Sequence, residues 1–136
     1  MEEYNVRLGH FLGLSLLFIA APGCPFDFYH LTSTPASFTR QIESPKSFVL
    51  KDEVVIAKNQ APCGYSRTLR TGSRWEQCGA IPVGEVYKSR DQVLTVECSN
   101  IYEAYLVVSD GLLSGFYLPV EKAYVSLPDK MNLPLR

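Results

Sequence analysis

Hydrophobic and polar positions divide the chain into three parts, the first of which is an apolar run. It covers residues 8–21, LGHFLGLSLLFIAA, and only two of its 14 residues are polar. A membrane span needs roughly 20 residues, whereas the apolar region of a secretory signal has ~7–15. Arg7 gives the run a positive flank, and Pro22 and Gly23 break a helix after it. The pattern predicts a signal peptide over residues 1–23.

The second part, residues 24–46, has no sustained apolar period. Pro25, Pro35 and Pro45 recur through it, with Ser and Thr between them. Prolines at this density favour an extended and semi-stiff chain. We therefore expect a linker between the signal and a folded domain.

In the third part, residues 47–130, apolar positions recur with the period of two that is typical of β-strands. Asp110-Gly111 is a strong hairpin signal between two such stretches, because a type I′ turn needs two positive φ angles. The pattern predicts a small all-β domain, followed by a tail at residues 131–136. Strand candidates are 48–50, 54–57, 84–88, 93–98, 101–108 and 112–118. Side chains expected to face the core are Leu94, Val96, Cys98, Tyr102, Ala104, Leu106 and Val108.

The end of this domain is similar to the closing segment of SH3-like barrels. Gly115-Phe116-Tyr117-Leu118-Pro119 would end one strand, residues 120–122 would turn, and Ala123-Tyr124-Val125-Ser126-Leu127 would form the last strand. The resemblance implies an SH3-like barrel, with a five-stranded OB-like barrel as the alternative. The acidic loop and paired tryptophans that bind proline-rich ligands are absent, so that activity is not carried over.

Composition limits the classes of function. The chain has 136 residues, is 46% hydrophobic and carries a net charge of −1. One domain of ordinary apolar content fits this length. A near-neutral charge argues against a nucleic-acid partner, because such domains are usually strongly basic.

The residues Ala21-Pro22-Gly23-Cys24 resemble the lipobox of bacterial lipoproteins. The resemblance implies that Cys24 becomes the first mature residue and carries lipid, which would attach the protein to a membrane. Pro25 follows where Asp would signal retention at the inner membrane, so the resemblance favours the outer membrane, facing the periplasm. Ordinary secretion and an uncleaved membrane anchor are the alternatives.

An exported chain folds in an oxidising compartment, where cysteines pair. Cys63 and Cys78 bracket a polar, Gly-containing stretch, and a bridge between them would close a roughly 15-residue loop, worth ~3 kcal/mol. We expect this disulfide; pairs with Cys98 stay open, as do two bridges if Cys24 carries no lipid. No C-x-x-C spacing occurs and the only His after the signal is His30, so we expect no metal and no cofactor.

The stretch between Cys63 and Cys78 is also the best candidate for binding. Arginine binds phosphate and carboxylate groups through two parallel hydrogen bonds, and aromatic rings offer stacking faces. An anionic cell-wall polymer or an acidic patch on an envelope protein would fit such a loop. In the alternative interpretation, the arginines face water and the only Trp fills the core. The candidate binding residues are Tyr65, Arg67, Arg70, Arg74 and Trp75.

The sequence gives no catalytic site, because motifs for nucleophilic, metal-dependent or phosphate-binding catalysis are absent. We therefore expect a protein that is not an enzyme. The leading hypothesis is a lipid-anchored binding or scaffolding protein of the bacterial envelope. The alternative is a small envelope inhibitor or immunity protein that acts against a lytic enzyme or toxin.

Overall fold

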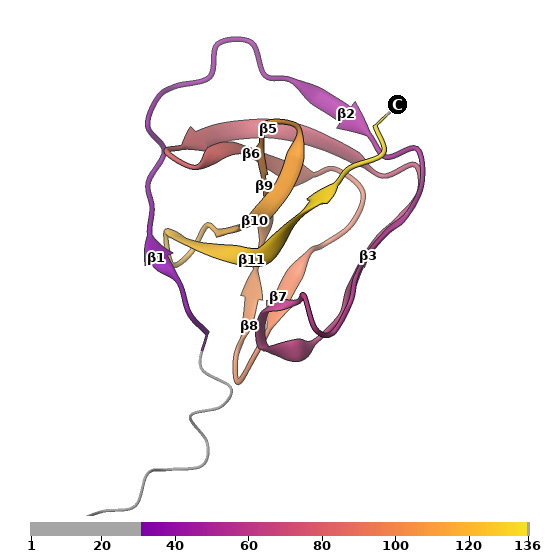
Figure 1. Ribbon diagram of the computed structural model, residues 1–136. Coiled ribbons are helices and arrows are strands. Elements are labelled where there is room, and N and C mark those ends of the chain that lie inside the picture. Colours follow the sequence, from indigo (N-terminus) through magenta and orange to yellow (C-terminus); the bar gives the residue numbers. More distant parts are fainter. Residues whose placement is uncertain (1–30, 136) are drawn as a thin grey trace, which may run out of the picture.

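The computed structural model describes residues 31–135 (Figure 1). The predicted signal peptide over residues 1–23 and the predicted lipidation site, Cys24, lie outside the described residues. Within the described chain, the structure is built of short strands and one 3-10 turn, Pro62–Gly64, which confirms an all-β domain. The strands are β1 (Thr34–Pro35), β2 (Ser47–Val49), β3 (Val54–Ile56), β4 (Arg67–Leu69), β5 (Arg74–Ile81), β6 (Gly84–Ser89), β7 (Thr95–Glu97), β8 (Ile101–Glu103), β9 (Tyr105–Ser109), β10 (Leu112–Leu118) and β11 (Ala123–Asn132).

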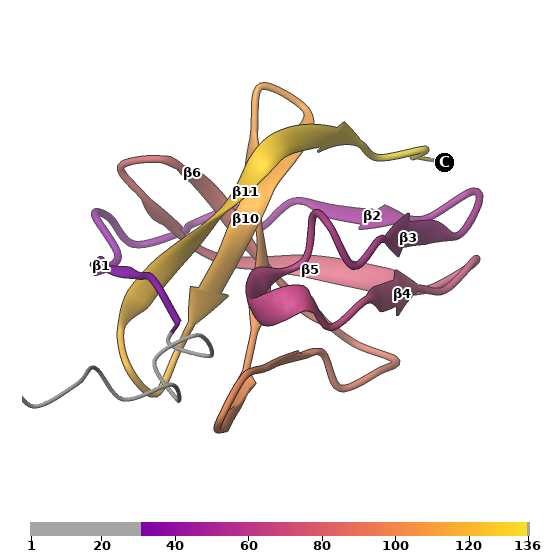
Figure 2. The ribbon, with the colours of Figure 1, turned by 60° about the horizontal axis from the view of Figure 1, so that its bottom comes forward.

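Seven strands form one antiparallel sheet in the order β1-β11-β10-β9-β6-β5-β2. The sheet curls, so that the chain after β2 meets the chain after β11. Leu50 bridges Leu135, and the Lys51 N–H donates a hydrogen bond to the Pro134 carbonyl at 2.7 Å. Figures 1 and 2 both show the C-terminal end beside β2. Because the hydrogen-bonded order leaves β1 and β2 as edges, an SH3-like or OB-like barrel stays a prediction.

Two turns of this sheet lie where the sequence predicts them. Asp110 and Gly111 join β9 to β10 with φ angles of 53° and 79°, as a type I′ turn requires. Strand β10 ends at Leu118, before Pro119, and Lys122 adopts a φ of 54° in the turn to β11. The chain after residue 130 is part of the domain rather than a tail, because β11 continues to Asn132.

The inner face of the curled sheet carries the main core. Trp75 on β5, Leu106 on β9 and Phe116 on β10 are fully buried there. Two separate hairpins, β3–β4 and β7–β8, contribute Ile56 and Val96 to the same core. Of the seven side chains of residues 93–108 predicted to face the core, five are buried on this face, and two, Cys98 and Tyr102, are partly buried against it. The five are Leu94, Val96, Ala104, Leu106 and Val108.

The predicted disulfide Cys63–Cys78 is wrong, because Cys63 pairs with Cys98. The two Cα atoms lie 5.3 Å apart, and the bond ties the 3-10 turn beside β4 to the end of β7. Cys78 is a free thiol in the middle of the long strand β5 and packs on the opposite, outer face of the sheet. The stretch from residue 63 to 78 is therefore no single loop, because β4 and the first half of β5 lie within it.

The described part of the predicted linker, residues 31–46, lies along the domain. The indigo and purple chain in Figure 1 runs from β1 around the sheet to β2. We name residues 34–39 the strap. Its strand β1 pairs with β11, the Ala36 N–H donates to the Lys122 carbonyl at 2.9 Å, and the Thr39 N–H donates to the Ala80 carbonyl at 2.7 Å. Proline is tolerated here because an edge strand leaves its missing N–H on the solvent side.

The strap lies there because the outer face of the sheet also carries apolar side chains. A second cluster on that face needs cover, and Ala36 of the strap packs against it. The buried members of this outer cluster are Ile81, Val86, Val107 and Tyr117.

Candidate functional site

The three predicted binding arginines are engaged within the domain. The Arg67 Nε–H donates to the Thr95 carbonyl at 2.7 Å, and its guanidinium forms an ion pair with Glu97. These contacts join β4 to β7 beside the disulfide. Arg70 donates from Nη2 to the Asp91 carbonyl at 3.1 Å.

Arg74 contacts the carboxylate of Asp91 through both its side chain and its backbone. Its Nη2 lies 2.8 Å from Oδ1, and its backbone N–H donates to Oδ2 at 2.6 Å. The side-chain hydrogen bond from Arg74 lowers the pKa of Asp91, and the backbone hydrogen bond acts in the same direction. This guanidinium is therefore already paired with a carboxylate of its own chain.

The two predicted aromatic residues have different environments. Trp75 is fully buried in the core, and its Nε1–H donates to the Ser73 hydroxyl at 2.9 Å. Tyr65 is 47% exposed at the end of the molecule that carries the disulfide. The five predicted residues therefore do not form one open surface, and the structure places Trp75 in the core, as the alternative interpretation expects.

A different group of side chains forms an open site on the outer face. Tyr124, Tyr117 and Tyr105 are direct cross-strand partners on β11, β10 and β9. The rings of Tyr105 and Tyr117 lie 6.5 Å apart between centroids. Lys88 on β6 continues the row, with its Nζ 5.7 Å from the centre of the Tyr105 ring, a distance at which cation–π attraction acts.

Phe38 of the strap forms one wall of this site. Its ring centroid lies 5.1 Å from that of Tyr117. The ring also lies against Gly79 on β5, where a Cβ atom would meet it at 2.7 Å. Gly79 is thus needed because it leaves room for the ring, and the strap closes one side of the outer face.

Between the strap and the strands lies a cleft of about 510 Å³, which we name the aromatic cleft. Its volume is within the range of ligand sites, roughly 300–1,000 Å³. Apolar groups form most of its lining, and its charged groups are two lysines. The residues that define it here are Phe38, Cys78, Lys88, Tyr105, Tyr117 and Lys122.

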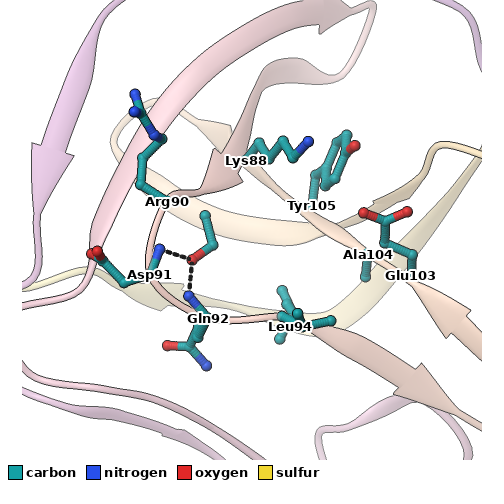
Figure 3. A pocket seen from close by; sticks show the side chains of 10 residues that line it. Lys88, Arg90, Asp91, Gln92, Leu94, Glu103, Ala104 and Tyr105 are labelled. Carbon is teal, nitrogen blue, oxygen red and sulfur yellow. Dashed lines mark hydrogen bonds between the residues drawn. The ribbon is translucent and has the colours of Figure 1, made fainter.

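A second cleft, of about 350 Å³, adjoins the aromatic cleft and shares Lys88 and Tyr105 with it (Figure 3). We name it the polar cleft. Figure 3 shows Lys88 and Tyr105 side by side, with Arg90 and Glu103 on opposite sides of the view. The turn below them is fixed by the Ser89 hydroxyl, which accepts hydrogen bonds from the N–H groups of the two residues after Arg90, at 3.1 and 2.9 Å.

Charge is distributed unevenly over the two clefts. Arg90, in the polar cleft, is held by Glu76 at 2.8 Å. Lys88 and Lys122, in the aromatic cleft, form no ion pair within residues 31–135. Their charges are therefore available to a ligand. Glu103 makes the far end of the polar cleft less favourable for an anion.

The polar groups on the floor of the aromatic cleft are not matched to acid–base chemistry. Burial raises the pKa of the Cys78 thiol and the pKa of the Tyr117 hydroxyl, so both groups stay protonated near neutral pH. Tyr117 is only 4% exposed, and its hydroxyl has no hydrogen-bond partner among the described residues. Within that part of the chain, no cluster of three His, Cys, Asp or Glu side chains is arranged to hold a metal ion. The arrangement is suited to binding a ligand.

The residues of the aromatic cleft are not among the binding candidates from the sequence, although the sequence holds a signal for one of them. In the strand that places Ala104, Leu106 and Val108 in the core, Tyr105 occupies a position of the opposite parity. A large aromatic residue on the expected solvent side of a strand is such a signal. Sequence alone could not show that Tyr117 and Lys88 would lie beside it, because that depends on the pairing of β10, β9 and β6.

Comparison with known proteins gives no match to a family model, a curated protein or a solved structure. Between Leu31 and Leu135 there is no helix long and apolar enough to cross a bilayer.

Proposed function

We propose that the protein is a lipid-anchored binding domain of the bacterial cell envelope. Cys24 carries the lipid, the domain faces the periplasm from the outer membrane, and the protein holds an envelope partner without chemical conversion of it. The ligand surface is the aromatic cleft, in place of the arginine-rich stretch that the sequence favours. The lipobox-like residues before Cys24 support the anchor.

One observation supports binding most strongly: the aromatic cleft combines a ring-lined floor with two lysines that the described chain leaves unpaired. Tyrosines are enriched among the few residues that supply most of the binding energy at interfaces, and unpaired cations add specificity for anionic groups. The three arginines lack this property, because each one already donates to an acceptor of the domain.

The position of the strap is consistent with an anchored domain. Nine residues separate Cys24 from Thr34, the first residue of β1. At ~3.3 Å per extended residue, such a segment spans about 30 Å at most. Lipid on Cys24 would therefore hold the aromatic cleft close to the membrane, within reach of other membrane-bound proteins.

The test is made in cells that express the full chain. Metabolic labelling with an alkyne fatty acid should mark the wild-type protein and leave a Cys24→Ala variant unlabelled. A photo-crosslinking amino acid in place of Tyr105 should capture an envelope component. Recovery of the chain from the cytosol without lipid would refute the lipid anchor. Crosslinks from position 105 that are no more frequent than crosslinks from the exposed position Val55 would refute the aromatic cleft as the binding surface.

A second function is favoured by the end of the molecule that holds the disulfide. The β7–β8 hairpin projects from the sheet in Figures 1 and 2, and Ile101 at its tip is 70% exposed. The bond Cys63–Cys98 ties its turn to the 3-10 turn Pro62–Gly64. A rigid hairpin with an apolar tip suits insertion into the active site of a lytic enzyme or toxin. Crosslinks from position 101 to such an enzyme, with none from position 105, would favour a function as an inhibitor or immunity protein.

A further inference from the structure

The aromatic cleft has a spacing that suits an extended polypeptide. Alternate side chains on one face of an extended chain lie ~6.6–6.8 Å apart. The centroids of Tyr105 and Tyr117 lie 6.5 Å apart, on neighbouring strands. An extended peptide that crosses β10 and β9 can therefore direct alternate side chains at the aromatic cleft.

The shape of the floor favours an inserted side chain over a flat ring stacked on top. The ring planes of Phe38 and Tyr117 meet at 33°, and those of Tyr105 and Tyr117 meet at 37°. Tyr117 is 4% exposed, so its ring face is not open as a stacking platform. Tyr117 lines the cleft, and its hydroxyl, which has no hydrogen-bond partner among the described residues, can donate to a backbone carbonyl of the ligand.

Charge defines the ends of the ligand. Lys88 extends from β6 beside Tyr105, and Lys122 belongs to the turn between β10 and β11. Both line the aromatic cleft, and no carboxylate of the described chain does. Carboxylates on each side of an inserted aromatic residue would pair with these two ammonium groups.

We propose that the aromatic cleft binds an extended acidic–aromatic segment of a partner protein, of the pattern acid-x-aromatic-x-acid. The period of two places all three side chains on one face of the segment. The central ring enters the cleft against Phe38 and Tyr105, and the two carboxylates lie over Lys88 and Lys122. This inference rests on the proposed function and names the chemistry of its ligand.

The direct test uses fluorescein-labelled synthetic peptides and the full chain in mild detergent, followed by fluorescence polarisation. The probe is Glu-Ala-Phe-Ala-Glu, with blocked ends. Matched peptides replace both acids with Lys or the central Phe with Gly. We expect saturable binding of the probe, at least about ten-fold weaker binding of each matched peptide, and weaker binding at high salt because screening acts on exposed charges.

Charge-reversal variants test which lysines act. Lys88→Glu/Lys122→Glu should weaken probe binding about ten-fold and should restore binding of the Lys-Ala-Phe-Ala-Lys peptide. The control is Lys58→Glu/Lys130→Glu, which makes the same change of net charge at two exposed lysines away from the cleft. Equal loss in both variants would mean attraction by bulk charge and would overturn the proposal.

The thiol of Cys78 gives a second readout, because it lines the aromatic cleft. Saturating probe peptide should slow its alkylation by iodoacetamide at least three-fold, as measured by mass spectrometry that resolves Cys78 from Cys24. Unchanged alkylation while the probe is bound would place the peptide elsewhere and overturn the proposal.

Two further outcomes separate this inference from the proposed function. If soluble peptidoglycan fragments displace the labelled probe more strongly than the unlabelled peptide does, the cleft is a glycan site and the proposed peptide ligand is overturned. Capture of an envelope component from position 105 in cells, with no binding of the acidic–aromatic probe, would refute the ligand class and leave the binding function in place.

Discussion

The two faces of the sheet differ in how completely they are covered. On the inner face, the curled sheet and two hairpins enclose Phe116 and Trp75 fully, and the Cys63–Cys98 bond ties the hairpins together. On the outer face, a short strap covers one part and leaves Tyr105 and Lys88 at the edge of a cleft. Neighbouring residues on one strand, Phe116 and Tyr117, thus belong to different environments.

This difference separates stability from binding. Side chains that the fold encloses contribute their burial to the free energy of unfolding. Side chains at the edge of a cleft keep part of their apolar surface in water, where a ligand can cover it. Changes on the inner face should therefore lower stability, and changes on the outer face should lower binding.

The largest expected effect compares two rings on adjacent strands and opposite faces. Phe116→Ala should lower the free energy of unfolding by about 3–5 kcal/mol, because it leaves a cavity in the core. Tyr105→Ala should lower the free energy of unfolding by about 1 kcal/mol or less, since its ring is partly exposed. The same change should abolish binding of the Glu-Ala-Phe-Ala-Glu probe. Urea denaturation measures both; equal losses of stability would contradict the distinction between the faces.

The disulfide should have the next largest effect, again on stability alone. Cys63 and Cys98 are 35 residues apart in sequence. Their replacement by Ser should lower the free energy of unfolding by about 2–4 kcal/mol, because the unfolded chain regains the entropy that the closed loop removes. Chemical denaturation of the variant and of Cys78→Ser, which keeps the bond, gives the comparison. Peptide binding at the outer face should survive in folded protein.

Gly79→Ala tests how the strap is held on the outer face. The added Cβ would meet the Phe38 ring at 2.7 Å, so the ring must move, at a cost of about 1–3 kcal/mol. Hydrogen exchange at the amides of Ala36 and Thr39 should become faster, because both donate to carbonyls that hold the strap. In a Phe38→Ala background the same substitution should cost much less. An equal cost in both backgrounds would exclude the steric explanation.

The smallest effect concerns acid stability and the pair Arg74–Asp91. The folded state lowers the pKa of Asp91, so the unfolded chain binds the proton first as the pH falls. The stability from this pair is present above about pH 4 and is lost as the pH falls through the lower folded pKa. Asp91→Asn should therefore show a smaller loss of stability between pH 6 and pH 3 than the wild type.

Glu85 adds acid dependence of the same sign. Its pKa is lowered chiefly by the hydrogen bond from Lys46. When Glu85→Gln is combined with Asp91→Asn, the loss of stability between pH 6 and pH 3 should become smaller still. A loss equal to that of the wild type in the double variant would show that other carboxyl groups determine the acid stability.

Local signals in the sequence are sufficient for much of the fold. Alternation predicts which side chains of residues 93–108 face the core, and Asp110-Gly111 predicts its hairpin, because both depend on nearby residues alone. Strand β5 was missed because its charged start, Arg74, and its polar Gln77 and Cys78 resemble a loop. Trp75 and Gln77 are buried at alternate positions, but Gln77 is polar, so apolar alternation does not reveal this strand.

Long-range pairing determines what the sequence could not predict. The choice of Cys98 as the partner of Cys63 depends on how two hairpins meet, and the closest cysteine in sequence, Cys78, lies on the other face. The arginines are engaged for the same reason, since Asp91 approaches from the turn after β6 and Glu97 from β7. The outer aromatic cleft likewise exists only after β10, β9 and β6 are side by side.

The two-residue strand β1 also determines how the domain responds to tension. It is joined to β11 at only two register positions, Thr34–Tyr124 and Pro35–Ala123, whereas the disulfide and the core hold the remainder together. A pull on the chain before β1 therefore acts first on this two-residue pairing. If this pairing separated before the sheet unfolded, the wall that the strap forms beside Tyr117 would change shape while the inner core stayed intact.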